Sequence, residues 1–403
     1  TPWNEAAPSE PLFLFKKSGG KVQTEYEAYH SLADVMPLYS MGIKSSRDEL
    51  VLDFEAAPVL ERIERFRCLQ FSDKAICEQM GVPLKIGWNV AKSRMELRAI
   101  KQLASKIQNF LYRPLDWRQL FYHRAVVFSA AYPVMQHLLS GKNIALVATR
   151  QTKDQWDVQC SRALVGHKSL GAYDANSVFP LYLLEDDSEL QQTLANEYRI
   201  NFSTAFLKSL AKVMSLKKEG ANSLPAGLTP EDIFHYIYGV FHSPTYRKRY
   251  SEFLKIDFPR VPLTSSLDLF RTLAKLGGEL VSLHLMESPK LEKPITKWGG
   301  RQRPEVEKVS YADGMVWIDK AQTEGFEGVP EDVWNFHIGG YQVCEKWLKD
   351  RKGRALSKDD LAHYQKIVVA LRETIRLMAE IDKVIEKHGG WPGAFQAANS
   401  SKA

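Results

Sequence analysis

The stretch "TPEDIFHYIYGVFHSPTYRKRY", residues 229–250, carries two helix-start signals in succession. Thr229 can cap a helix whose first turn contains Pro230 and Asp232, and these residue types are preferred at those positions. Ser243, followed by a second proline, repeats the device. Between the two signals the apolar residues recur at helical spacing. The stretch therefore predicts two consecutive helices, the first with an inward-facing apolar stripe.

The second of these helices combines tyrosines with three consecutive cations, Arg247, Lys248 and Arg249. Tyr246 and Tyr250 fall on one face together with the apolar residues that follow, so we expect them in the core. Positive charge near a helix N-terminus opposes the helix dipole, and a bound anion such as a phosphate would reverse the sign of that interaction. Two interpretations of the cations stay open, a phosphate contact and a solvated basic face.

Two further local signals lie toward the C-terminus. The segment "RPEVEKVSYADGMVWID" predicts a pair of strands around Asp313-Gly314, because an Asp-Gly turn between apolar runs is typical of a hairpin. A long amphipathic helix is predicted to start after Ser357, with Asp360 completing a capping box, and to stop at Gly389-Gly390.

The first half of the chain changes from helical to strand-like patterns. The segment "ELVLDF" at 49–54 alternates as a strand does. From residue 57 to residue 112, that is from "APVLERIERF" to "KQLASKIQNFLY", apolar residues recur every three or four positions and predict helices. Between 112 and 185 the runs "LFYH", "RAVVFSA", "NIALVATRQ" and "VFPLYLLE" predict the short strands of a small sheet.

These patterns define a mixed α+β fold in two subdomains, with a small β-sheet core, flanking helices and a long C-terminal amphipathic helix. A polar stretch that ends near residue 225 predicts an internal boundary there. We therefore divide the chain into 41–224 and 225–403, and treat 1–40 as a junction with a preceding domain. The chain begins with Thr1 rather than methionine, which indicates a processed product or a piece of a longer polypeptide.

The composition is that of a globular protein with a mild basic excess. Lys and Arg number 54 against 48 Asp and Glu, a net charge of +6 that suits a polyanionic partner without requiring one. The four cysteines show no CxxC pair and no zinc-ligand spacing, so we expect no metal site and a reducing, cytoplasmic location. Because no leader and no run of about 18 apolar residues are present, we predict neither secretion nor a membrane partner.

Catalytic signatures are missing from the sequence. It contains no GxxxxGK(S/T) phosphate loop, no GxSxG elbow, no HExxH pair and no GxGxxG loop. The asparagine-proline-proline-aromatic element with which amino-methylating DNA enzymes hold a flipped base is also missing. We therefore predict that this chain alone is not catalytic.

Clusters of Arg and Lys with Asp, Ser or Gln recur at predicted turns. They are "GIKSSRD" (42–48), "YRPLDWR" (112–118), "ATRQ" (148–151), "YRKR" (246–249) and "KWLKDRKGR" (346–354). Side chains of these types can read base edges in a major groove while cations hold phosphates. Each cluster can equally be structural, since Arg113 and Asp116 can pair with each other. Their number, in a chain without a catalytic motif, favours nucleic-acid recognition.

Several of these stretches together resemble a known family. The most specific are "EDIFHYIYGVFHSPTYRKRYSEFLKIDFPRVP" and "GVPEDVWNFHIGGYQVCEKWLKDRKGRALSKDDLAHYQKIV", supported by "SMGIKSSRD", "LYRPLDWRQLFYH" and "VMQHLLSGKNIALVATRQ". From about Ser40 to about Asp382 the chain is similar to the C-terminal target recognition (specificity) domain of the type ISP restriction-modification enzymes.

The resemblance implies a role in reading DNA. Members of this family are single polypeptides with a nuclease, an ATP-driven translocase, a coupling domain, an N6-adenine DNA methyltransferase and, last, this domain. The resemblance therefore implies double-stranded DNA and the upstream methyltransferase and translocase domains as partners, with residues 1–40 next to the methyltransferase. It also implies S-adenosylmethionine, ATP and Mg²⁺ as cofactors of the full-length enzyme, and none for this chain.

The resemblance and the side-chain chemistry together give a set of candidate DNA-binding residues. Arg150 and Gln151 are candidates for base reading, and the cations of 247–249 suit phosphates. The full set is Lys44, Ser45, Arg47, Arg113, Asp116, Arg118, Arg150, Gln151, Arg247, Lys248, Arg249, Lys346, Arg351 and Arg354.

Two other functions stay open. The chain could be an adenine methyltransferase in its own right, which would require it to bind S-adenosylmethionine. It could also be a structural coupling module whose basic turns dock on other domains of the same polypeptide. The recognised bases do not follow from the sequence, because a donor or acceptor reads a base only once its direction in the groove is fixed.

Overall fold

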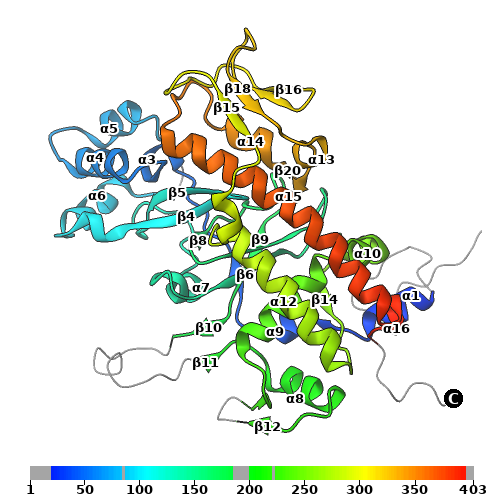
Figure 1. Ribbon diagram of the computed structural model, residues 1–403. Coiled ribbons are helices and arrows are strands. Elements are labelled where there is room, and N and C mark those ends of the chain that lie inside the picture. The colour runs from blue at the N-terminus through cyan, green and yellow to red at the C-terminus, as the bar shows by residue number, and fades with distance from the viewer. Residues whose placement is uncertain (1–19, 84–86, 185–198, 220–222, 396–403) are drawn as a thin grey trace, which may run out of the picture.

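The computed structural model describes residues 20–83, 87–184, 199–219 and 223–395, and it has the predicted α+β class (Figure 1). Three four-stranded sheets and several two-stranded ones are interspersed with helices. Buried hydrophobic side chains form one cluster that runs through these ranges. In the part of the chain just defined, no helix combines the length and the apolar character that crossing a membrane requires.

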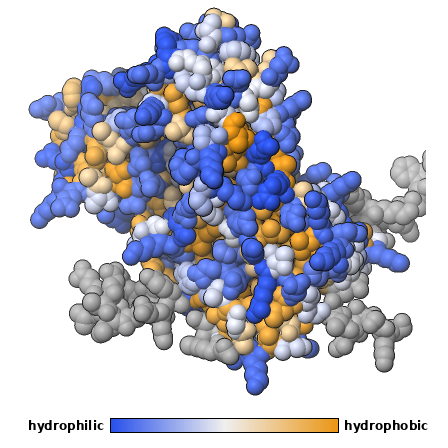
Figure 2. Space-filling view, in the orientation of Figure 1, coloured by the Kyte–Doolittle hydropathy of each residue, from blue (hydrophilic) through white to orange (hydrophobic). Residues whose placement is uncertain are grey.

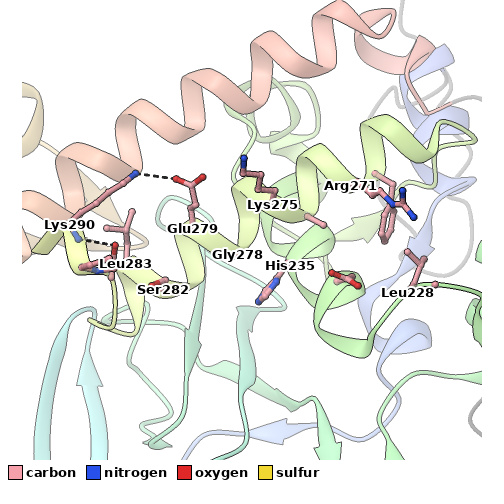
Figure 3. A pocket seen from close by; sticks show the side chains of 15 residues that line it. Leu228, His235, Arg271, Lys275, Gly278, Glu279, Ser282, Leu283 and Lys290 are labelled. Carbon is pink, nitrogen blue, oxygen red and sulfur yellow. Dashed lines mark hydrogen bonds and ion pairs between the residues drawn. The ribbon is translucent and has the colours of Figure 1, made fainter.

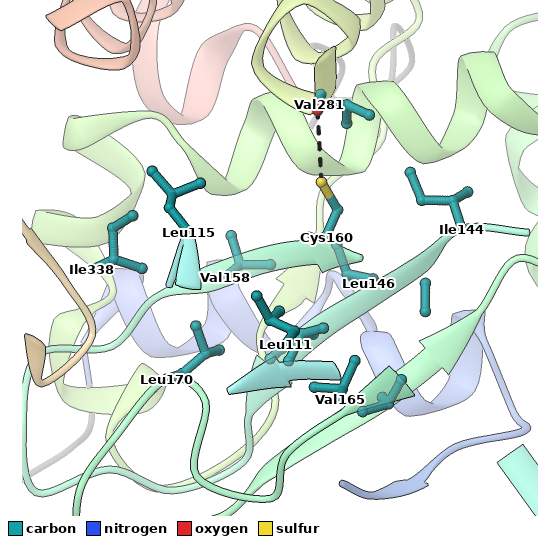
Figure 4. Close-up of a cluster of buried hydrophobic side chains, with 14 of the residues drawn as sticks. Leu111, Leu115, Ile144, Leu146, Val158, Cys160, Val165, Leu170, Val281 and Ile338 are labelled. Atoms are coloured by element: carbon teal, nitrogen blue, oxygen red, sulfur yellow. Dashed lines mark hydrogen bonds between the residues drawn. The ribbon is translucent and has the colours of Figure 1, made fainter. Parts of the chain in front are cut away.

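An antiparallel sheet with strand order β2-β9-β6-β7 occupies the middle of the molecule. Its strands are β2 (Ser40–Met41), β6 (Ala145–Thr149), β7 (Val158–Ser161) and β9 (Asn176–Pro180). Every residue of β6, β7 and β9 is buried, as expected for apolar runs covered on both faces. Figure 4 shows Cys160 pointing from β7 toward a helix, where its thiol lies 3.9 Å from the Val281 carbonyl oxygen. The strands predicted in "NIALVATRQ" and "VFPLYLLE" are confirmed.

A second sheet, with strand order β3-β5-β4-β8, lies beside the first. Its strands are β3 (Leu52–Asp53), β4 (Ile107–Arg113), β5 (Asp116–Phe121) and β8 (Leu164–Val165). Directly after β8 the chain bridges the two sheets, because Gly166 pairs with Ile43 just beyond β2. Glycine is required at position 42, since a Cβ there would lie 2.6 Å from the Gly166 carbonyl carbon.

Three local predictions in this half are wrong in part. The segment 107–112, predicted as helix, is the strand β4, which pairs with β5 along its length. Only the end of "ELVLDF" is a strand, because Asp48–Val51 forms the short helix α3. The run "RAVVFSA" forms turns with an isolated bridge at Ser129. Pairing with distant segments, which the local pattern does not contain, decides these conformations.

The predicted helical part before β4 is confirmed. It consists of α4 (Ala56–Arg67), α5 (Asp73–Gln79) and α6 (Val90–Arg98). Helix α4 turns Val59, Ile63 and Phe66 inward and packs against β5. Ser72 and Asn89 cap α5 and α6 with their side-chain oxygens, as these residue types commonly do.

Three helices pack together beside the central sheet, with the middle one of the three in contact with β7. They are α9 (Pro230–Phe241), α12 (Leu267–His284) and α15 (Lys358–Lys387), and Figure 1 shows α15 running diagonally across the molecule with α12 beside it. Both predicted capping boxes are present, Thr229 with Asp232 and Ser357 with Asp360. Helix α15 stops just before Gly389, whose φ is +106°. The helices predicted from these signals are confirmed.

The third four-stranded sheet has the order β15-β18-β17-β16 and packs near the start of α15. Its strands are β15 (Lys297–Gly299), β16 (Ser310–Ala312), β17 (Met315–Trp317) and β18 (Gly325–Glu327). The predicted hairpin is confirmed: Asp313 and Gly314, both with positive φ, join β16 to β17. The hairpin of β19 (His337–Ile338) and β20 (Tyr341–Gln342) then leads into α14 (Val343–Lys349).

The remaining elements are short. The helices are α1 (Lys21–Glu27), α2 (Leu32–Val35), α7 (Tyr132–Met135), α8 (Thr204–Val213), α10 (Pro244–Arg249), α11 (Ser251–Leu254), α13 (Glu331–Trp334) and α16 (Gly390–Gly393). The strands are β1 (His30–Ser31), β10 (Tyr182–Leu183), β11 (Arg199–Ile200), β12 (Lys218–Glu219), β13 (Leu224–Pro225) and β14 (Arg260–Val261). Single turns of 3₁₀ helix span Leu103–Lys106, Gln136–Leu138 and Pro289–Glu292.

The division at residue 225 and the junction role of 1–40 stay predictions. Strand β1 pairs with β14, so the chain before residue 40 packs on the segment after the boundary. The first part of the predicted junction, 1–19, lies outside the described residues.

Two glycines let α9 and α12 approach closely. A Cβ on Gly277 of α12 would lie 1.9 Å from the His235 carbonyl oxygen, and one on Gly239 of α9 would lie 2.7 Å from the Leu273 carbonyl oxygen. Both obstacles are backbone atoms, which cannot rotate away. Gly278 differs, because its Cβ would meet the His235 ring at 3.1 Å, the far end of a side chain.

We predict that Gly277→Ala lowers the free energy of unfolding by about 3 kcal/mol, at the upper end of the usual cost of overpacking. Gly278→Ala is the matched control: its gain in helix propensity and its contact with His235 should leave stability within about 1 kcal/mol of the parent. Urea unfolding followed by circular dichroism measures both. Equal unfolding midpoints for the two variants would contradict the close-contact argument.

Candidate nucleic-acid interface

Three loops converge at one end of the central sheet. Strand β2 ends at Met41, opposite Ser177 near the start of β9, and β6 ends at Thr149, opposite Asn176. Because neighbouring strands lie about 4.8 Å apart, the loops that follow β2 and β6 and the loop that precedes β9 leave the sheet side by side. We call residues 41–45, 150–155 and 167–175 the sheet-end surface.

The buried side chain of Asn176 holds the loop that precedes β9. Its Oδ1 accepts hydrogen bonds from the backbone N–H groups of Ser169 (2.9 Å) and Leu170 (3.3 Å), and its Nδ2 donates to the Gly166 carbonyl at 3.0 Å. A buried polar group that is satisfied in this way specifies one geometry for the chain around it. The backbone of the loop is therefore fixed, although its tip is exposed.

The sheet-end surface presents cations and amides, together with Met41 (63% exposed), Tyr173 (74% exposed) and the partly exposed carboxylates of Asp154 and Asp174. Exposed side chains on it include Lys44, Arg150, Gln151 and Lys153, and Lys168 is half-buried. Arg150 Nε lies 3.2 Å from Asp257 Oδ1, but the Arg150 side chain is still 60% exposed, and ion pairs of this kind are weak. The carboxylate of Asp174 accepts the Lys153 backbone N–H at 2.7 Å and is thus partly used within the loop. The surface suits a polyanion whose edges also carry donors and acceptors.

The pKa of His167 depends on burial and on the charges of this surface. Burial lowers the pKa of its imidazole, and the nearby charges of Lys168 and Lys44 lower that pKa further. The ring is therefore neutral at pH 7, and its Nδ1 lies 3.1 Å from the Ile43 carbonyl oxygen. The positive charge of the surface thus comes from lysines and arginines that lie close together.

The cluster "GIKSSRD" splits into an accessible part and a buried part. Lys44 is exposed, with its Nζ 5.1 Å from the centre of the Phe128 ring, and the Ser45 hydroxyl donates to the Asp48 carboxylate. Arg47, by contrast, is 4% exposed and donates from Nη1 to a backbone carbonyl at 3.0 Å. Only the first part of this predicted cluster faces solvent.

Two other predicted clusters, "YRPLDWR" and "KWLKDRKGR", bind each other. Asp116, 1% exposed, lies between two arginines: its Oδ1 is 2.8 Å from Arg351 Nη2, and its Oδ2 is 3.2 Å from Arg118 Nη2. Arg351 is itself 4% exposed, and burial lowers the pKa of its guanidinium. A buried carboxylate between the buried Arg351 and the mostly buried Arg118 leaves little charge for an outside partner.

Aromatic rings extend this contact into a stack. The Arg351 guanidinium lies 3.5 Å from the Trp347 ring centre, and the Arg118 guanidinium lies 3.8 Å from that of Tyr112. The Arg113 guanidinium contacts the same tyrosine, 4.3 Å from the Tyr112 ring centre, and it also lies 4.9 Å from the Tyr341 ring centre. Stacked guanidinium groups of this kind stabilise packing as well as carrying charge.

Arg113 also reaches the sheet-end surface. Its Nη1 donates to the Lys168 carbonyl at 2.8 Å, and the Tyr341 hydroxyl donates to the same oxygen at 3.1 Å. The stack therefore supports the loop that carries Lys168 from below. Arg113 is a candidate to position this loop through its backbone.

Two other predicted cations of "KWLKDRKGR" are partly exposed but paired. Lys346 Nζ lies 2.6 Å from Asp350 Oδ1, and Arg354 Nη2 lies 3.3 Å from Glu55 Oε1 and 3.5 Å from Asp360 Oδ2. Their side chains are 35% and 26% exposed. Of these partners only Glu55 is exposed, at 70%, so the Arg354–Glu55 pair is the one that could be exchanged for a phosphate at little cost.

A carboxylate of the protein itself lies at the start of α10, where the sequence left a bound phosphate open. The carboxylate of Asp382 on α15 accepts the Thr245 backbone N–H at 3.0 Å and the Thr245 hydroxyl at 2.7 Å, and it also accepts the Ser243 hydroxyl. Tyr246 and Tyr250 are fully buried, so their predicted place in the core is confirmed. The helix start thus needs no phosphate to offset its dipole.

The three cations of α10 differ in their surroundings. Arg247 Nη2 lies 2.7 Å from the buried Asp157 Oδ1, and Arg249 makes two hydrogen bonds, of 2.8 and 2.7 Å, to Glu25. The bonds to Arg249 and Tyr250 outweigh the effect of burial and lower the pKa of the Glu25 carboxyl. Lys248, between them, is exposed.

A concave feature of a different kind lies between α9 and α12. It is a cavity of about 830 Å³, and Figure 2 shows hydrophobic residues gathered in this part of the face. Its charged lining is mixed: in Figure 3 Lys290 reaches Glu279, with Nζ 3.1 Å from Oε2. Burial lowers the pKa of His235, so this ring adds no charge at neutral pH. The cavity therefore lacks the uniform positive charge that a polyanion requires.

Some residues of the sheet-end surface were not singled out from the sequence. They are Lys153, Lys168 and the 74%-exposed Tyr173. Their signal is weak, because each is a single polar or aromatic residue in a loop between predicted strands. Only the pairing of β2, β6 and β9 brings them next to Lys44 and Gln151.

A family model places the chain among known proteins. The model for the Type ISP C-terminal specificity domain matches residues 34–380, most of the chain. The chain belongs to this family, as the resemblance of its motifs predicted. A comparison with curated protein sequences found no match.

Solved structures of three enzymes share the fold at 16–18% sequence identity. A nuclease-deletion mutant of the Type ISP enzyme LlaGI, in complex with a DNA substrate mimic, matches with a TM-score of 0.64 over 94% of this chain and 30% of that chain. The Type ISP enzyme LlaBIII bound to DNA matches with 0.68 over 88% and 24%, and the DrdV–DNA complex matches with 0.65 over 94% and 38%. This chain therefore spans between a quarter and two fifths of the length of these proteins.

We predict that Arg351→Ala destabilises the protein by about 3–5 kcal/mol, because it leaves the Asp116 carboxylate buried with one partner fewer. Lys352→Ala, an exposed neighbour, should change the free energy of unfolding by less than about 0.5 kcal/mol. Chemical denaturation of both variants measures the difference. An Arg351→Ala protein as stable as its control would mean that Asp116 is not held as described.

Proposed function

We propose that this chain recognises a sequence in double-stranded DNA through its sheet-end surface. The observation that carries the proposal is the convergence of three loops that carry cations and amides at one end of a buried sheet. Membership of a specificity-domain family and the likeness to DNA-bound enzymes support it. Loops held by a rigid scaffold are where binding residues commonly lie.

Within this proposal the residues divide into three groups. Gln151 and Arg150 read base edges, since an amide can pair with adenine and a guanidinium with guanine, each by two hydrogen bonds. Cations hold phosphates: the exposed Lys44 and Lys153 and the half-buried Lys168 on the sheet-end surface, and the exposed Lys248 on α10. The buried Arg47, Asp116 and Arg351 and the mostly buried Arg118 act indirectly, by fixing the elements from which the loops emerge.

The chemistry that follows recognition belongs, in this proposal, to other parts of a longer enzyme. Adenine N6-methylation with S-adenosylmethionine, and ATP- and Mg²⁺-dependent cleavage, are assigned to upstream methyltransferase, translocase and nuclease domains. This chain would select the asymmetric site and present it to the methyltransferase.

The experiment is a selection from a random duplex pool with the purified chain at two salt concentrations, followed by sequencing. An enriched asymmetric motif, with binding that weakens steeply as salt rises, would support the proposal. Salt-sensitive binding without a motif would assign specificity to another part of the enzyme. No binding to any duplex would favour the coupling-module alternative. Binding of S-adenosylmethionine to the isolated chain would favour the methyltransferase alternative.

Two substitutions separate base reading from phosphate contact. Gln151→Ala should weaken binding by about 1–3 kcal/mol and relax the preference at a single base-pair position. Lys153→Gln should weaken binding to all sequences alike and reduce the salt slope by about one. Lys293→Gln, an exposed lysine before β15, is the charge-matched control and should change neither quantity. If Lys153→Gln and Lys293→Gln behave alike in a fluorescence-anisotropy titration, the loop of 150–155 does not contact the phosphate backbone of the DNA.

A further inference from the structure

An exposed aromatic side chain stands at the border of the sheet-end surface. Phe128 is 62% exposed, although it belongs to the apolar run "RAVVFSA" whose valines, Val126 and Val127, are fully or almost fully buried. An exposed aromatic ring beside a candidate binding surface is accessible to a bound partner.

The backbone around Phe128 is rigid. Its N–H donates to the Ser45 carbonyl at 3.1 Å, while Lys44 and Ser129 exchange two backbone hydrogen bonds of 3.0 and 2.9 Å. On the other side, the Tyr122 hydroxyl donates to the Ala130 carbonyl at 2.7 Å. The ring is thus presented on a fixed backbone and not on a loose loop.

A cation lies beside the ring. Lys44 Nζ is 5.1 Å from the ring centre, within the range of a cation–π contact. Arg124, four residues earlier in the sequence, is 83% exposed and lies 3.6 Å from the Glu96 carboxylate. Lys44 follows Met41 by three residues, so the chain geometry keeps its Cα within about 11 Å of the end of β2. Phe128 therefore lies next to the loop of 41–45, one of the three loops of the sheet-end surface.

Together these features match the way proteins deform DNA. Apolar side chains that enter between base steps partly unstack them, and flanking cations hold the phosphates on either side. A protein partner would equally cover a phenyl ring, but it would not explain why a lysine lies over the ring at the border of a surface that carries further cations.

We propose that Phe128 is a wedge that stacks against a base and opens one base step at the edge of the recognised site. This inference rests on the proposed function and adds to it a mechanism that reads deformability rather than base edges. A step that unstacks easily, such as a pyrimidine–purine step, would be preferred at that position without any hydrogen bond to it.

The experiment uses duplexes of the selected motif that carry 2-aminopurine at one position at a time, because this base fluoresces more strongly when it is unstacked. With the parent chain, binding should raise the fluorescence at one step or at two adjacent ones. Phe128→Ala should abolish that rise and weaken binding about tenfold, within the range for removal of one stacked aromatic. Its salt slope should stay unchanged, because no phosphate contact is lost.

Three controls make the result specific. Phe128→Trp should keep the fluorescence rise, and Lys44→Gln should keep it while reducing the salt slope by about one. Ile295→Ala removes another exposed apolar side chain, 37% exposed and outside the interface, and should behave as the parent does. Thermal unfolding should be nearly unchanged in all four variants, since each alters an exposed side chain.

Two outcomes overturn the inference. One is parental affinity and a parental fluorescence rise in Phe128→Ala, which would assign the exposed ring to a protein contact. The other is the absence of a rise at every position with the parent chain, which would mean that no step is opened. Failure of the parent chain to bind any duplex is a different result, because it removes the proposed function itself.

Discussion

The position of the candidate interface depends on one buried carboxylate. Asp116 lies between Arg118, two residues away, and Arg351, 235 residues away in sequence. Because an ionised carboxylate is unfavourable in the interior without partners, this site is formed only when the β4–β5 turn and α14 meet. Their meeting orders the aromatic stack, and the stack brings Arg113 to the Lys168 carbonyl. A contact far from the proposed DNA surface thereby sets the shape of one of its loops.

Positive charges are neutralised by carboxylates of the same chain at several other places. Its small net charge hides many cations, and most of those that the sequence clusters contain are neutralised from within: Arg247 by Asp157, Arg249 by Glu25, and the start of α10 by Asp382. Each partner comes from a distant segment, so each ion pair also fixes the packing of two elements. A small number of cations in these clusters stays exposed. The pairing of strands in the central sheet places several of them at one end of that sheet.

The difference between local signals and contacts with distant segments explains what the sequence could and could not predict. Helix starts such as Thr229 with Asp232 were predictable, because capping uses residues three positions apart. The strand at 107–112 was not, because its partner β5 and not its own pattern determines its conformation. In the candidate site, the sequence identified Lys44 and Gln151 as polar turn residues, and the structure places both on the sheet-end surface. It could not distinguish them from Arg47 or Arg351, because whether an arginine is exposed or buried depends on partners that lie far away in the chain.

The hydrogen bonds of the Asn176 side chain separate the shape of a binding loop from the chemistry of its exposed side chains. Asn176 binds backbone groups, so the path of residues 167–175 depends little on which side chains the tip carries. Substitutions at the tip can therefore accumulate without loss of folding. In evolutionary terms, such a loop can acquire a new specificity in single steps while the scaffold beneath it stays the same.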